Sequence, residues 1–126
     1  MSNPTDLKYT DDHEWVRIEG DVATVGITAH AAQTLSDLVF IDLPEVGDDL
    51  TSGSSFGEIE SVKAVSDLNA PMDGEVVAVN DELADNLTDV ASDPYGKGWM
   101  VKIKFSGSLD GMMDAAAYEA HVAAAS

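Results

Sequence analysis

The chain has 126 residues, of which 44% are hydrophobic, and this length and composition suit one globular domain with its own core. It contains no cysteine, which excludes disulfides, thiolate metal sites and cysteine nucleophiles. Its net charge is −18, from 24 acidic and 6 basic residues, so we expect it to bind neither nucleic acid nor an anionic membrane, because both would repel it.

The acidic excess has two interpretations. Aspartate outnumbers glutamate by 16 to 8, and lysine is scarce. An ordinary solvated acidic surface would give this composition. Adaptation to high salt would give it too, because screening over roughly 3 Å at 1 M makes dense surface charge tolerable.

Targeting signals are absent from the printed sequence. No apolar run approaches the roughly 20 residues of a membrane-spanning helix. Residues 1–8 are polar, without the apolar stretch of a signal peptide or the basic amphipathic character of a transit peptide. We therefore expect a protein of the prokaryotic cytoplasm.

The first predicted elements form a β-hairpin followed by a short helix. Residues 16–19 alternate between apolar and polar, Gly20-Asp21 is typical of a turn, and residues 22–27 predict the returning strand. Thr28 is a suitable N-cap for a helix over 29–38. The expected buried face of that helix is Ala32, Leu35 and Leu38.

Short strands separated by glycine and proline fill the middle of the chain. The predicted strands cover residues 38–43, 56–62, 65–68 and 75–79. Pro44 ends the first of them, Pro71 interrupts the third, and Gly74 precedes the fourth. We expect Phe40 to belong to the hydrophobic core, together with Trp15 and Trp99.

The last third predicts one more strand and a terminal helix. Asn80 is expected to cap a single helical turn, residues 86–97 are predicted to be mostly loop, and the clean alternation over 99–105 predicts a strand. A helix is predicted over 109–124. Its expected buried face is Leu109, Met112, Met113 and Ala116. So many short strands with Gly and Pro turns predict a mainly β fold, either a sandwich or a small barrel.

The segment around Lys63 is nearly a mirror of itself. Two strands that meet at Lys63 would pair matching residues across a hairpin and leave this lysine at the tip. The expected partners are Val62 with Val65, Ser61 with Ser66, Glu60 with Asp67, and Ile59 with Leu68.

The predicted tip is a poor turn by local preference. Turns favour Gly, Asn, Asp or Pro, whereas this one reads Val-Lys-Ala-Val. Such a conflict between local and global preference often marks a functional position. A single lysine presented there is an accessible amine for an acylating enzyme. The alternative is an ordinary solvated lysine, but the symmetric setting favours acylation.

Over nearly its whole length the chain resembles the H proteins of the glycine cleavage system. The matching stretches are Tyr9, His13–Val16, Ala23–Thr28, Leu38–Pro44, Gly57–Leu68, Ala70–Pro71, Gly74–Val77, Asp93–Gly96 and Gly98–Met100. Each stretch alone would be weak, but the combination is highly specific. The sequence departs from the family pattern at Ser36 and over 86–90, away from Lys63.

The resemblance implies a hybrid barrel-sandwich of the lipoyl- and biotinyl-carrier kind. It implies one lipoyl-carrier domain over residues 1–126, with a core over about 8–105 and the C-terminal helix over about 109–124. It also implies lipoate bound covalently to Lys63. The protein would then be a carrier that is not itself a catalyst.

The partners that the resemblance implies are four enzymes. A pyridoxal-phosphate glycine decarboxylase (P protein) would load the lipoyl group with the aminomethyl group of glycine. A tetrahydrofolate-dependent aminomethyltransferase (T protein) would unload it, and dihydrolipoyl dehydrogenase (L protein) would reoxidise it. A lipoylating enzyme would attach the lipoate.

Two acidic residues are candidates for the pocket that, in this family, receives the loaded arm. Glu14 belongs to the matching His-Glu-Trp stretch, and its carboxylate could hold a cationic aminomethyl group by a charge-assisted hydrogen bond. Its alternative is an exposed acid before a strand. Asp67 is a second candidate of the same kind. We expect His30 to be structural or solvated.

Other function classes fit the sequence less well. A biotin acceptor usually has methionine on both sides of its lysine, and here the neighbours are Val62 and Ala64. Lipoyl domains of oxoacid dehydrogenases commonly have Asp-Lys-Ala at the modified lysine, whereas Val62 precedes Lys63 here. The His13-Glu14 pair lacks the second histidine of a zinc protease, so no metal site is expected. No convincing nucleophile–base pair suggests an enzyme.

Overall fold

Two antiparallel sheets form the frame of the computed structural model, which describes residues 4–10, 13–35, 37–105 and 112–125. The strands are β1 (Lys8–Tyr9), β2 (Glu14–Glu19), β3 (Val22–Ile27), β4 (Leu38–Asp42), β5 (Asp49–Leu50), β6 (Ser55–Ser61), β7 (Val65–Asn69), β8 (Gly74–Val79) and β9 (Val101–Phe105). The helices are α1 (Ala29–Leu35), the 3₁₀ helix η1 (Asp81–Asp85), α2 (Thr88–Ser92) and α3 (Ala115–Ala125). The prediction of a mainly β fold is therefore confirmed.

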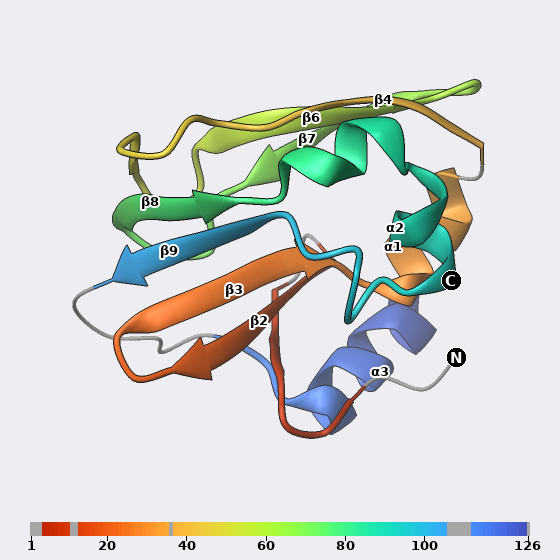
Figure 1. Ribbon diagram of the computed structural model, residues 1–126. Coiled ribbons are helices and arrows are strands. Elements are labelled where there is room, and N and C mark those ends of the chain that lie inside the picture. The colour runs from red at the N-terminus through yellow and green to blue at the C-terminus, as the bar shows by residue number, and fades with distance from the viewer. Residues whose placement is uncertain (1–3, 11–12, 36, 106–111, 126) are drawn as a thin grey trace.

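The two sheets form two layers (Figure 1). One sheet has the strand order β1-β2-β3-β9-β8-β5 and the other β4-β6-β7. Side chains from both sheets fill the space between them, among them Val16, Val25, Ile41, Ile59, Leu68, Val76 and Ile103. Side chains alternate along a regular strand, so β3 contributes Ala23, Val25 and Ile27, whereas the register shifts in β4, β6 and β8 interrupt this alternation. The β6–β7 pair is thus fixed on its inner face and open on its outer face.

A second cluster packs beneath α3. It consists of Leu7, Tyr9, Trp15, Ala115 and Tyr118. The backbones of Tyr9 and Met113 exchange hydrogen bonds of 2.7 and 2.8 Å, and the rings of Tyr9 and Tyr118 stack with centroids 4.9 Å apart. This cluster ties the C-terminal helix to the first strands of the chain.

The terminal helix differs from its prediction. It begins at Ala115, and Met112 and Met113 precede it as half-buried residues. Ala116 is exposed, and Ala115 and Tyr118 form the buried face instead; Leu109 lies outside the described residues. The bridge between Met113 and Tyr9 explains the later start, because it uses the backbone of Met113 for strand-like pairing.

Three shorter elements also differ in detail from what the sequence predicted. The helix expected over 29–38 ends at Leu35, because Leu38 already pairs with Ser61 in β4. The side-chain amide of Asn80 does not cap η1; it donates to the carbonyl oxygens of Lys97 and Trp99 at 2.9 and 2.8 Å. The stretch over 86–97 is mostly loop as predicted, but it includes the short helix α2.

The predicted core is correct for Trp15 and wrong for Phe40. Trp15 is fully buried, and its indole N–H donates to the carbonyl oxygen of Pro94 at 2.8 Å, whereas Trp99 is half-buried. Phe40 is 49% exposed. The pairing of β4 with β6 shifts register between Leu38 and Phe40, and this irregularity leaves two consecutive side chains, Val39 and Phe40, outside the core.

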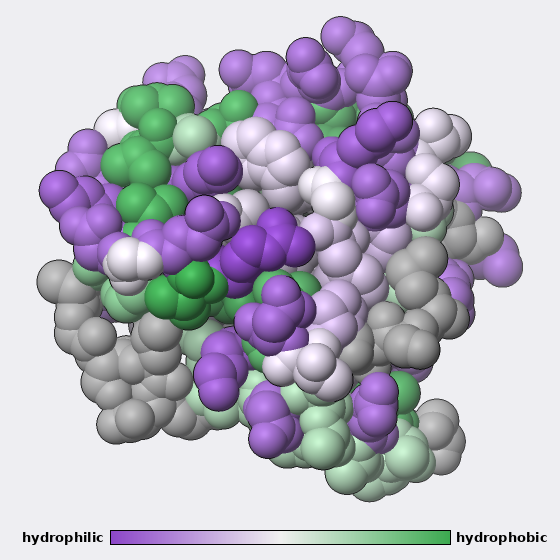
Figure 2. Space-filling model, turned by 60° about the horizontal axis from the view of Figure 1, so that its bottom comes forward, coloured by the Kyte–Doolittle hydropathy of each residue, from purple (hydrophilic) through white to green (hydrophobic). Residues whose placement is uncertain are grey.

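Hydrophilic side chains spread over the face shown in Figure 2, with apolar ones between them. No helix in the described part of the chain is long and apolar enough to span a bilayer. On the outer face of β4-β6-β7, Glu58 lies opposite both Asp42 and Asp67. Like charges directly opposite one another destabilise a sheet. The acidic composition thus produces local repulsion as well as a high net charge.

We expect stability to rise with salt because screening removes this repulsion. The melting temperature should rise from low salt to about 1 M, where the Debye length falls to roughly 3 Å. Glu58→Gln should raise the low-salt melting temperature by roughly 2–5 °C, and this gain should shrink at 1 M salt. Thermal melts of both proteins across a KCl series check this. A midpoint that stays flat across the series would remove the high-salt interpretation.

Candidate functional site

Lys63 lies exposed at the tip of the hairpin that joins β6 to β7. The backbone N–H of Ser61 donates to the carbonyl oxygen of Ala64 at 2.8 Å, so the two-residue tip is Val62-Lys63. The hydroxyl oxygen of Ser61 also accepts the N–H groups of Lys63 and Ala64 at 3.2 and 3.0 Å. A serine side chain therefore supports a turn whose own residues have little turn preference.

The predicted register of this hairpin is wrong by two residues. Glu60 pairs with Val65, Ile59 with Ser66, and Glu58 with Asp67. The reason is the Ser61–Ala64 pair, which places the tip one residue earlier than the mirror symmetry suggests. A displacement by two keeps every side chain on its expected face, so Ile59 and Leu68 still point into the core.

Exposed apolar side chains surround the lysine. Val62 is 72% exposed, and its backbone N–H donates to the carbonyl oxygen of Asp37 at 3.0 Å, which anchors the tip to the start of β4. Phe40 and Val65 both pair with Glu60 and are both exposed. We call Val39, Phe40, Val62 and Val65 the apolar surface beside Lys63.

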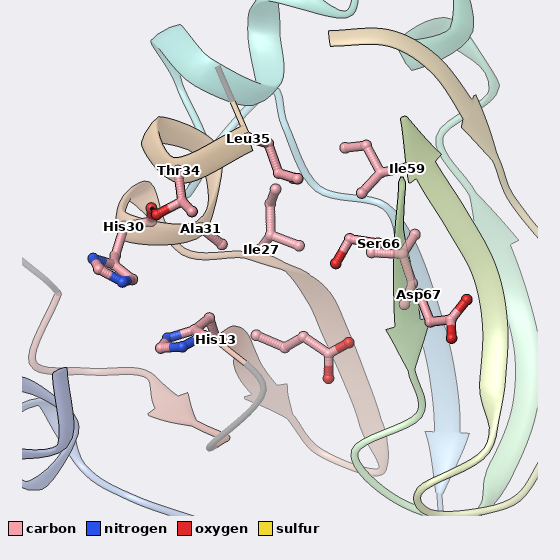
Figure 3. A pocket seen from close by; sticks show the side chains of 11 residues that line it. His13, Ile27, His30, Ala31, Thr34, Leu35, Ile59, Ser66 and Asp67 are labelled. Atoms are coloured by element: carbon pink, nitrogen blue, oxygen red, sulfur yellow. Dashed lines mark hydrogen bonds between the residues drawn. The ribbon is translucent and has the colours of Figure 1, made fainter. Parts of the chain in front are cut away.

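A pocket of about 150 Å³ lies between α1 and the same hairpin (Figure 3). Its lining residues are His13, Glu14, Ile27, His30, Ala31, Thr34, Leu35, Ile59, Ser66, Asp67 and Leu68. One wall is therefore built by the strands whose tip carries Lys63. Ser66 is three residues from Lys63, about 10 Å along an extended strand, so a long group on this lysine would have the pocket within reach.

Both acidic candidates line this pocket, but in different ways. Glu14 is only 3% exposed, and its Oε2 accepts the backbone N–H of Asn69 at 2.7 Å, so the alternative of an exposed acid is wrong. Asp67 is exposed, and in Figure 3 its carboxylate points away from Ile27 while Ser66 points toward it. Glu14 is thus the better placed carboxylate for a group held inside the pocket.

His13 and His30 line the pocket as well, and neither was predicted there from the sequence; His30 was expected to be structural or solvated. His13 Nδ1 lies 2.8 Å from the hydroxyl oxygen of Tyr118, which in turn lies 2.7 Å from the hydroxyl oxygen of Thr28. Burial raises the pKa of Tyr118 above its ordinary value, so this hydroxyl keeps its proton near neutral pH. The adjacency of His13 and Glu14 in the sequence was the available signal; His30 offered none.

The pocket combines an apolar lining with a buried carboxylate. Among the described residues, no three His, Cys, Asp or Glu side chains are arranged to hold a metal ion. Ile27, Leu35 and Ile59 suit an apolar stem, and Glu14 suits a small cationic end group. The arrangement can bind and shelter such a group.

Known proteins resemble the chain over almost its full length. A family model described as glycine cleavage H-protein matches residues 7–125. A glycine cleavage system H protein of Acaryochloris marina is 56% identical over 121 residues, covering 94% of both chains. One from Myxococcus xanthus is 54% identical over 119 residues, covering 93% of this chain and 92% of its own. The crystal structure of a glycine cleavage system H protein from Mycobacterium marinum superposes with a TM-score of 0.90 at 42% identity, covering 96% of this chain and 99% of that one.

Proposed function

This chain belongs to the glycine cleavage H-protein family, and we propose that it is a lipoyl carrier that shuttles the aminomethyl group of glycine between the components of the glycine cleavage system, with Lys63 bearing the lipoyl group. The observation that carries this proposal is the exposed lysine at a supported hairpin tip, beside a pocket with a buried carboxylate. The fold is the barrel-sandwich of that family.

The residues present fit a lipoyl group. The Lys63 amine is exposed for acylation, and the neighbouring pocket has an apolar lining for a carbon chain. A lipoyl group bound there would supply the disulfide that accepts the aminomethyl group. The protein's own part is to present the arm and to shelter its loaded end, so the chain acts as a carrier and leaves catalysis to its partners.

Lys63 is the best placed of the five lysines. Lys8, Lys102 and Lys104 lie within paired strands, and Lys97 lies in the loop before β9. The ammonium of Lys102 sits 5.4 Å from the centroid of the Trp99 ring. Only Lys63 combines exposure with the tip of a two-residue hairpin, where an enzyme can approach the amine from several directions.

The proposed partners are the decarboxylase, the aminomethyltransferase, dihydrolipoyl dehydrogenase and the lipoylating enzyme. The apolar surface beside Lys63 fits the lipoylating enzyme best. This enzyme must reach the amine on the lysine's own short stem, so it must contact the protein immediately around the tip. Enzymes that act on the lipoylated arm can work at a longer distance from the protein.

Glu14→Gln should shorten the lifetime of the loaded arm without preventing lipoylation. Glutamine keeps the shape of the side chain and can still accept the Asn69 N–H, but it loses the charge that faces a cationic aminomethyl group. A hydrogen bond to a charged group contributes about 1.5–3 kcal/mol, so the lifetime should fall about 10- to 100-fold. The measurement is the decay of the loaded form in both proteins.

Glu58→Gln is the matched control. It removes the same charge from the outer face of the hairpin, and Glu58 does not line the pocket. Its loaded arm should live as long as that of the unaltered protein. Equal lifetimes for the Glu14 variant and the unaltered protein would count against a role for Glu14.

A further inference from the structure

The chain has three histidines, and the fold brings all of them together. The His13 ring lies 4.9 Å from the ring of His30 and 5.8 Å from that of His121, measured between centroids. They come from three separate segments: the residue before β2, helix α1 and helix α3. Figure 3 shows His13 and His30 on the side of the pocket opposite Ser66 and Asp67. His121 is not among the residues that line the pocket.

The surroundings of His13 suit both of its charge states. When Nδ1 lacks a proton, the Tyr118 hydroxyl can donate to it and accept from Thr28. When Nδ1 carries a proton, the same hydroxyl can accept from His13 and donate to Thr28. Neither state loses a hydrogen bond on this side. His13 also has a backbone φ of 66°, a left-handed conformation that residues other than glycine adopt uncommonly.

Charged and titratable groups on several elements lie near His13 and His30. Glu14 on β2 and Asp67 on β7 line the same pocket, but the carboxylate of Asp67 points away from Ile27, so Glu14 is the acidic group inside the pocket (Figure 3). Tyr118 and His121 approach from α3. Residues 11 and 12, two aspartates that precede His13, lie outside the described residues. The ring centroids of His13 and His30 are 4.9 Å apart, so a proton on one imidazole opposes a proton on the other.

A cation in the pocket would compete with these protons for Glu14. We propose, on the basis of the carrier function above, that His13 and His30 determine which charge the pocket accepts. With both imidazoles neutral the pocket holds the ammonium of the loaded arm beside Glu14, and protonation of the pair expels the arm. Retention of the loaded arm is therefore lost as the pH falls and the imidazoles take up protons. The two histidines are then specificity-determining residues of the carrier.

Thermodynamic linkage gives this proposal a direct test. If protonation weakens the binding of the arm, binding of the arm must weaken protonation by the same factor. The sign is fixed: a cation beside an imidazole disfavours its charged form, so the loaded protein must bind the histidine protons less tightly than the unloaded one.

The experiment is an NMR titration of the imidazole signals in the full-length lipoylated chain, before and after aminomethyl loading. Single His→Asn variants assign the three signals, and asparagine tolerates the positive φ of His13. Loading should lower the proton affinity of His30 about tenfold and that of His13 by a similar factor, with His121 changing less than about twofold. His121→Asn, the matched control, should leave the effect on His30 intact.

Intact mass and the Glu14→Gln variant distinguish a failure of the histidine inference from a failure of the proposed carrier function. If mass shows loading on Lys63 and retention depends on Glu14, but the titrations of His13 and His30 do not change on loading, this inference is overturned and the carrier function stands. If no mass is added at Lys63, both are overturned. If His30→Asn abolishes the shift at His13 while loading persists, the pair acts as one unit, as proposed.

Discussion

Replacing Lys63 with arginine is expected to abolish lipoylation of the protein. Arginine keeps the positive charge and the length of the side chain, but its guanidinium stays protonated and is not an amine that the enzyme can acylate. Lys63 is exposed at the hairpin tip, so its replacement should leave the fold and the melting temperature unchanged. Aminomethyl loading should disappear together with lipoylation.

The test is incubation with a lipoate ligase followed by intact mass measurement. Lys97→Arg is the matched control, since Lys97 is also exposed but lies in the loop before β9. That variant should gain one lipoyl group like the unaltered protein. Lipoylation of Lys63→Arg at an undiminished level would contradict the assignment of Lys63 as the lipoylated residue.

The second large effect is on stability, at Gly57 in β6. A β-carbon at this position would overlap the backbone carbonyl oxygen of Asp42 in the neighbouring strand β4. The contact is with backbone, so no side chain can move aside to relieve it. We expect Gly57→Ala to lower the free energy of unfolding by about 3 kcal/mol. The melting temperature should then fall by roughly 10 °C.

Because β6 leads directly into the hairpin tip that carries Lys63, this damage should also reach the site. Thermal and urea unfolding measure the loss of stability. Ser54→Ala, at an exposed position directly before the same strand, is the control and should change the free energy of unfolding by less than about 0.5 kcal/mol. If Gly57→Ala melts with the unaltered protein, the close approach of β4 and β6 described above is wrong.

Local patterning accounts for the elements that the sequence predicted well. The hairpin over β2 and β3 was readable because Gly20, with φ of 65°, stands at the turn between two alternating runs. The local pattern also predicted a strand over 56–62, which overlaps β6 closely. It did not give the register, which depends on hydrogen bonds from Ser61 that no alternation pattern encodes.

Elements shaped by distant contacts were predicted poorly. The start of α3 depends on the bridge from Met113 to Tyr9, more than 100 residues earlier in the chain. The exposure of Phe40 depends on a shift of register against β6. Each of these is decided by tertiary pairing, which overrides the local preference of the segment.

The functional site could be predicted from the sequence only in part. Lys63 stood out through the symmetry around it, whereas Glu14 and Asp67 were candidates only through the family resemblance. Residues that line one pocket from β2, α1 and β7 have no shared pattern in the sequence. For the same reason the approach of His30 to His13 becomes visible only once the chain is folded.

The central claim is that this protein carries a lipoyl group on Lys63. Peptide mapping by mass spectrometry of the protein isolated from its native cell tests it most directly. We expect the mass of one lipoyl group on the peptide that contains Lys63 and on no other lysine peptide. A biotinyl mass at Lys63, or a lipoyl group on any other lysine, would contradict it.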